Sequence, residues 1–67
     1  TARDETMRAL SQLAPRRRAI VVMRFYEDMP LAAIAARLGI EEGTVKSQLS
    51  RALEQLRGQL AGRTEHA

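Results

Sequence analysis

The sequence predicts a small all-α domain, and three observations support that prediction. Apolar residues recur at spacings of three and four, which is the period of an amphipathic helix. No stretch alternates apolar and polar residues over the length of a strand, and β-branched residues are sparse outside positions 20–22. Pro15, Pro30 and Gly39 divide the periodic segments from one another. We therefore expect four helices containing a helix-turn-helix, with no sheet and no wing.

The first two helices are expected at residues 3–13 and 15–27. Met7, Leu10 and Leu13 fall on one face of the first, and Pro15 cannot continue it because proline lacks the backbone N–H. The same proline suits the first position of a second helix, where no N–H is needed. The face of this second helix that we expect to be buried carries Ala19, Ile20, Val22, Met23 and Tyr26. Phe25 is also assigned to the core, and the methionines are assigned to the core or its edge.

The third and fourth helices are expected at residues 31–38 and 42–60. Leu31, Ile34, Ala35 and Leu38 follow the spacing of one buried stripe, and Gly39 is expected to end that helix in a left-handed conformation. One face of the long last helix carries Val45, Leu49, Leu53, Leu56 and Leu60. We assign residues 1–60 to a single domain and expect the tail, residues 61–67, to fray.

The composition excludes several classes of function. The 67 residues include no Cys and one His, His66, so we expect no metal site and no cofactor. No Gly-rich phosphate loop follows a strand, and so small an α domain offers no obvious cleft; an enzyme is therefore not expected. No apolar run is long enough to span a bilayer, and we expect a cytoplasmic protein with no membrane insertion. Because the chain opens at Thr1, it is consistent with a piece of a longer protein.

Residues 31–51 fit a helix-turn-helix, in which a short helix and a tight turn precede a longer helix. Ala35 is small where two helices cross, Gly39 permits the turn, and Ile40 and Val45 fill the corner. The simpler alternative is an antiparallel helical pair with a solvated polar face. The polar residues of the last helix favour the first interpretation, because residues 44–51 include no acid. Short donors and two cations suit phosphates and base edges in a major groove.

The net charge is +3, and ten of the eleven cations are Arg, a residue suited to bidentate phosphate contacts. We predict that the DNA-binding residues are Thr44, Lys46, Ser47, Gln48, Ser50, Arg51, Arg16 and Arg17. Arg16 and Arg17 open the second helix, where cations oppose the helix dipole unless an anion lies nearby. Glu41 and Glu42 are interpreted as partners of the helix dipole rather than as DNA contacts.

Several blocks of residues, taken in order along the chain, form a recognisable pattern. They are Leu13-Ala14-Pro15-Arg16-Arg17-Arg18-Ala19-Ile20, Arg24-Phe25-Tyr26-Glu27-Asp28, Ile34-Ala35, Leu38-Gly39-Ile40, and Gly43-Thr44-Val45-Lys46-Ser47 through Leu49-Ser50-Arg51-Ala52. Together they resemble region 4 of bacterial sigma factors of the sigma-70 family, and most closely the extracytoplasmic-function group. The resemblance covers about residues 5–60.

The resemblance implies a four-helix domain whose last helix reads the promoter −35 element during transcription initiation. It also implies docking on the β flap of RNA polymerase and, as in many members, masking by an anti-sigma factor. Lys46, Ser47 and Arg51 match family positions that meet bases or phosphates, and Gln48 and Ser50 match positions that vary with the promoter. Gln48 replaces the usual Arg and could read adenine. Glu41 replaces a frequent Ser, which is a better N-cap.

Two alternatives remain open. The DNA-binding domain of LuxR-type response regulators also has an Ile-Ala pair, a Leu-Gly-Ile turn and Thr-Val-Lys on its reading helix. That family usually continues with a His, whereas this chain continues with Ser47, and the block at residues 24–28 also favours the sigma-factor interpretation. The second alternative is a helical protein-interaction module that binds only an anti-sigma partner.

Overall fold

The computed structural model describes the backbone of residues 2–66 and the side chains of residues 3–60. The elements are α1 (Ala2–Ser11), α2 (Pro15–Val21), η1 (Val22–Tyr26), α3 (Leu31–Leu38) and α4 (Glu42–His66). Residues 2–66 contain no strand. The predicted all-α, four-helix fold class is therefore confirmed, with η1 as a π-helical continuation of α2.

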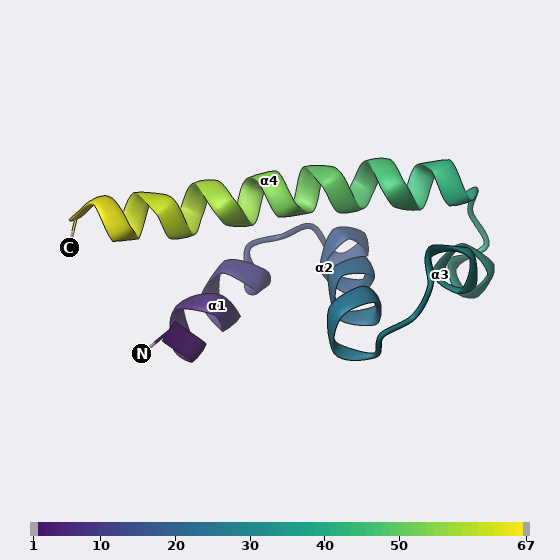
Figure 1. Cartoon of the computed structure of the whole chain (residues 1–67), viewed down its shortest axis with the longest axis horizontal. Coiled ribbons are helices and arrows are strands. Elements are labelled where there is room, and N and C mark those ends of the chain that lie inside the picture. The colour runs from purple at the N-terminus through teal and green to yellow at the C-terminus, as the bar shows by residue number, and fades with distance from the viewer. Residues whose placement is uncertain (1, 67) are drawn as a thin grey trace.

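The long helix α4 organises the fold. It runs along the length of a molecule that measures 40 × 19 × 17 Å, and α1, α2 and α3 follow one another along one side of it (Figure 1). Each of these three helices packs against α4. The core consequently lies between α4 and the row of shorter helices.

The start of α2 and both ends of α3 lie where the sequence predicts them, whereas α1 ends at Ser11, two residues before the predicted end. Ala14 is extended, with ψ of 147°, and Pro15 follows as the first residue of α2. Pro30 is extended before α3, and Gly39 ends α3 with φ of 69°. The N–H of Ile40 then donates to the carbonyl oxygen of Ala35 at 3.1 Å, which satisfies one of the last carbonyl groups of the helix. The left-handed cap at Gly39 is confirmed.

The end of the second helix differs from the prediction. In η1 the N–H of Glu27 donates to the carbonyl oxygen of Val22 at 3.1 Å, which is a π-helical bond. A π turn holds one residue more per hydrogen-bonded ring than an α turn, so later residues leave the face set by α2. Phe25 and Tyr26 are accordingly 56% and 63% exposed. Their assignment to the core was wrong.

The core consists of two clusters that meet at α4. Leu10, Leu13, Val21 and Ala52 form the first, and Ile20, Ile34, Ala35 and Val45 form the second. Leu49 packs against both. Two further corrections arise here. Met7 is 53% exposed rather than part of the core, and Ala52, which sequence reasoning missed, is fully buried.

The last helix is longer than predicted, because α4 continues to His66 instead of ending near Leu60. Gly62 does not stop it, since one glycine costs a helix interior only about 1 kcal/mol relative to alanine and no proline follows. The fraying predicted for residues 61–67 stays a prediction.

Candidate nucleic-acid interface

The helix-turn-helix is formed by α3, the turn at Gly39 and α4. Ile34, Ala35 and Val45 are buried together between the two helices, and Ile40 is partly buried against them. The left-handed Gly39 lets the chain turn sharply within three residues, so α4 can begin at Glu42 and run across α3 (Figure 1). This packing fixes which face of α4 is turned outward.

The outward face of the first half of α4 is polar. The side chains of Thr44, Lys46, Ser47, Ser50 and Arg51 are exposed, and Gln48 is half-buried. No acidic residue interrupts residues 43–53. Lys46 and Arg51 make no hydrogen bond or ion pair within the described part of the chain. Two cations are therefore available to an anionic partner at this face.

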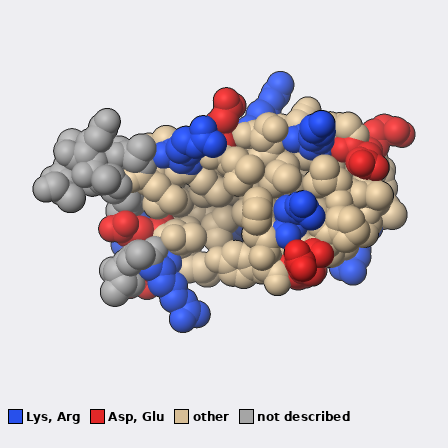
Figure 2. Space-filling view, in the orientation of Figure 1, with Lys and Arg blue, Asp and Glu red and all other residues tan. Residues whose placement is uncertain are grey.

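Acidic groups lie where α4 begins. Glu41 and Glu42 are exposed, and the space-filling view shows acidic atoms gathered at this end of the molecule (Figure 2). The carbonyl oxygen of Glu41 accepts from the N–H groups of Thr44 and Val45 at 3.0 and 3.1 Å. Glu41 thus caps the helix through its backbone, and its carboxylate lies near the positive end of the helix dipole.

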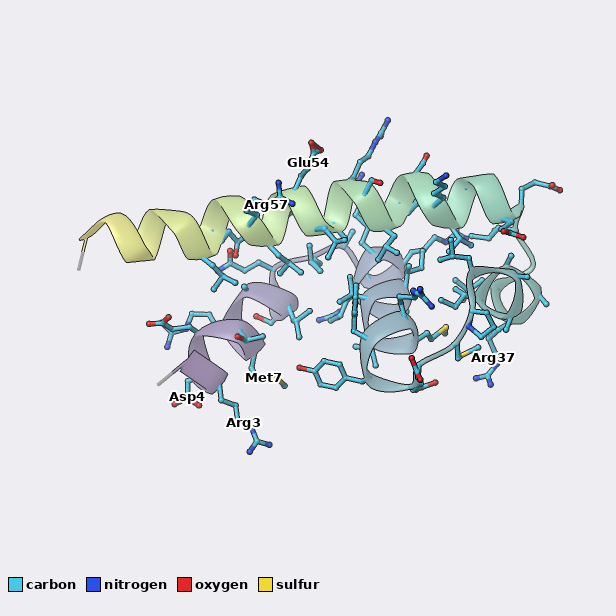
Figure 3. All side chains as sticks on the ribbon, viewed as in Figure 1. Arg3, Asp4, Met7, Arg37, Glu54 and Arg57 are labelled. Carbon is cyan, nitrogen blue, oxygen red and sulfur yellow. The ribbon has the colours of Figure 1, made fainter. Side chains whose placement is uncertain are left out.

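The second half of α4 carries charges on a different part of the surface. Glu54 and Arg57 point away from α1, α2 and α3 (Figure 3). Both are exposed. Arg57 lies on the same helix as Arg51 but beyond the acid-free window, so it provides a comparison cation with the same chemistry.

The start of α2 contacts the polar face of the first half of α4. Arg16 is exposed, whereas Arg17 is half-buried and its Nε donates to the Oε1 of Gln48 at 2.8 Å. This bond brings together two predicted site residues that are 31 positions apart in the chain. Sequence reasoning placed both in the site but gave no sign that they touch. The structure therefore joins α2 to the polar face of α4.

Three large apolar side chains lie outside the core: Met7 of α1 and Phe25 and Tyr26 of η1 are each more than half exposed. Met7 lies on the side of α1 that is remote from α4 (Figure 3). The π turn is the physical reason for the exposure of the two aromatic rings. Sequence reasoning missed the exposure of Phe25 and Tyr26, because helical spacing alone suggested that they lie on a buried face.

Metal and membrane chemistry find no support among the described residues. Within residues 3–60, no group of three or more His, Cys, Asp or Glu side chains could hold an ion. No helix of the described chain is long and apolar enough to cross a membrane.

The fold is that of a helix-turn-helix domain, and the first half of α4 carries an exposed polar face without acidic residues. A model of the family described as sigma-70, region 4, matches residues 3–56. The chain belongs to that family, in its extracytoplasmic-function group, and is a sigma-factor DNA-binding domain.

Relatives from three bacteria agree with this assignment. The chain is 49% identical over 57 residues to RNA polymerase sigma-E factor of Streptomyces coelicolor, covering 85% of the chain and 32% of the relative. It is 44% identical over 52 residues to RNA polymerase sigma factor SigV of Bacillus subtilis, covering 78% and 31%. It is 47% identical over 49 residues to ECF RNA polymerase sigma factor SigL of Mycobacterium tuberculosis, covering 73% and 28%. The chain spans about a third of the length of these relatives.

Proposed function

We propose that this domain recognises the −35 element of a promoter by placing the first half of α4 in the major groove, and that it docks on the β flap of RNA polymerase. The observation that carries the first part is the exposed, acid-free face of residues 44–51, held outward by the buried Ile34, Ala35 and Val45. The relatives are all RNA polymerase sigma factors by name, which supports a role in transcription initiation.

In this proposal each side chain has a role that suits its chemistry. Lys46 and Arg51 bind backbone phosphates, because their charges have no partner within the described residues. Arg16 and Arg17 add phosphate contacts from α2. Thr44, Ser47, Gln48 and Ser50 reach base edges with short donors and acceptors. Each base contact contributes about 1–3 kcal/mol of discrimination between bases. Because association itself costs several kcal/mol, polymerase must supply further binding energy.

The exposure of the apolar side chains of Met7, Phe25 and Tyr26 supports a protein partner as well as DNA, and we propose that they belong to one docking surface. Clusters of exposed apolar side chains often mark sites of protein association. We assign this surface to the β flap, and an anti-sigma factor would compete for the domain where one exists. Because RNA polymerase works in the bacterial cytoplasm, we assign this activity to that compartment. The alternative of a pure interaction module predicts this surface without any sequence-selective contact with DNA.

The test of the DNA-binding role is the affinity of the chain for promoter duplexes at several salt concentrations. Removing one phosphate contact should reduce the log–log salt slope by about 0.9. Arg51→Ala should therefore weaken binding and flatten the slope by about that amount, with an unchanged melting temperature. Arg57→Ala removes an equal charge from the same helix outside the window. Equal losses of affinity for both variants would mean that binding depends on net charge only.

The test of the polymerase role is an NMR titration of the labelled chain with a fragment of the β flap. Saturable shifts around Met7, Phe25 and Tyr26 are expected. A folded chain that shows no shifts would contradict flap docking and would leave the DNA-binding role to be tested by itself.

A further inference from the structure

The hydrogen bond between Arg17 and Gln48 fixes the orientation of a side chain on the reading face. The Nε of Arg17 lies 2.8 Å from the Oε1 of Gln48, and both residues are half-buried. A guanidinium group has only donors, so it can face a glutamine amide only on the oxygen side. The choice between oxygen and nitrogen, which is ambiguous for a free glutamine, is therefore determined by Arg17.

This orientation limits what Gln48 can offer to a base. A free glutamine reads adenine by accepting from N6 and donating to N7. The bond from Arg17 occupies one of the two lone pairs of the amide oxygen, whereas the NH₂ group on the other branch of the planar amide keeps both of its donors. Guanine presents two adjacent acceptors, O6 and N7, whereas adenine presents an amino group beside its acceptor. The Arg17–Gln48 pair presents more donors than acceptors, since Arg17 has only donors and takes up part of the accepting capacity of Gln48. The pair is thus better matched to guanine than to adenine.

We propose that Arg17 is a positioning residue for Gln48, and that the pair selects guanine over adenine at the base pair that Gln48 meets. This inference rests on the proposed function, since it requires the polar face of α4 to enter the major groove. It changes the expectation from sequence, in which an unconstrained Gln48 could read adenine.

Affinity alone cannot test this inference. Arg17 uses one of its five N–H donors on Gln48, and the others are free to bind a phosphate. Loss of Arg17 should therefore weaken binding to every sequence, because a positive charge is removed. The diagnostic quantity is the ratio of guanine to adenine at one base pair, since phosphate contacts carry no sequence information and their removal leaves that ratio unchanged.

The experiment is selection of bound duplexes from a random library at low salt, with the wild-type chain and three variants. Gln48→Ala identifies the base pair that Gln48 contacts, because the base preference of the domain should disappear at that base pair in this variant. Arg17→Met should shift the ratio at that base pair toward adenine by about ten-fold, within the usual discrimination of an amide contact. Arg16→Met, the matched control, removes the neighbouring exposed cation and should weaken binding without moving the ratio.

The outcomes separate this inference from the proposed function. If folded Arg17→Met keeps the wild-type ratio while Gln48→Ala loses its preference, the positioning role is overturned and the DNA-binding role stands. If the wild-type chain selects no sequence at all, the proposed function is overturned, and this inference with it. A shift in the ratio that occurs equally in Arg16→Met would also overturn the positioning role.

Two further measurements cover a variant that fails to fold. In the free wild-type chain, NMR should show the Arg17 Nε–H exchanging with water more slowly than that of Arg16, and equal rates would overturn the pairing. Gln48→Glu keeps an acceptor for Arg17 but has no NH₂ group. It should therefore lose the guanine preference, because it has no donor left for O6 and N7. A guanine preference kept in Gln48→Glu would overturn the inference.

Discussion

Two glycines of this domain should respond in opposite directions to the same substitution. Gly39 ends α3 with φ of 69°, whereas Gly58 lies within α4. A Cβ built on either residue meets no atom within 4 Å. Steric clashes therefore contribute to neither variant, and the difference between Gly39→Ala and Gly58→Ala isolates the backbone conformation.

The magnitudes follow from that conformation. The left-handed conformation costs a residue with a Cβ roughly 1–2 kcal/mol, offset in part by about 0.4–1 kcal/mol from the stiffer unfolded chain. Gly39→Ala should lower the free energy of unfolding by about 1 kcal/mol. Gly58→Ala replaces glycine in an exposed helix interior and should raise it by about 0.8–1.0 kcal/mol. The two variants should differ by about 2 kcal/mol.

Thermal melts followed by circular dichroism, with urea titrations beside them, measure both variants. A change of 1 kcal/mol should move the melting temperature of a domain of this size by roughly 4–8 °C. The dependence on urea should stay constant, because neither change alters the buried surface. A more stable Gly39→Ala variant would refute the left-handed cap. A less stable Gly58→Ala variant would refute a continuous helix through residue 58.

Three other predictions address the core, the cap and the apolar surface. Val45→Asp should unfold the domain, because Val45 is fully buried and burying an unpaired carboxylate there costs several kcal/mol. A cooperative thermal melt of a helical variant, followed by circular dichroism, would contradict this. Glu41→Ser should raise the free energy of unfolding by about 0.5–1 kcal/mol, because a serine side chain caps the helix, as a denaturation titration would show. The same variant should bind DNA more tightly, because a negative charge is removed, as a duplex titration would show. Weaker DNA binding would mean that Glu41 contacts DNA directly. Tyr26→Ser should change stability by less than about 0.5 kcal/mol, because the ring is exposed, yet weaken binding to a β-flap fragment; unchanged binding would remove Tyr26 from that surface.

The features that depend on local sequence were predictable. Pro15 and Pro30 mark the starts of α2 and α3, and Gly39 marks the left-handed end of α3. Each acts through its own backbone geometry, which does not depend on distant neighbours. The core positions Ile34 and Val45 followed from helical periodicity for a similar reason, since the buried face of a regular helix repeats along the chain.

The features that depend on tertiary contacts were not predictable. The π turn at Val22–Tyr26 has no signature in the residues themselves, so Phe25 and Tyr26 were misassigned to the core. Ala52 was overlooked because small residues are buried where two helices approach closely, and that approach is set by the partner helix. The bond between Arg17 and Gln48 spans 31 positions, and it exists only because α2 packs against α4.

The position of α4 in the chain has a consequence for synthesis on the ribosome. Each of α1, α2 and α3 finds its packing partner in α4, which is made after all of them. As these segments leave the exit tunnel, the part of their packing that α4 supplies is missing, and short helices are marginal in water. The nascent segments should therefore stay largely unstructured until the residues around Leu49, which join both halves of the core, have emerged. Folding is then expected in a single late step rather than helix by helix.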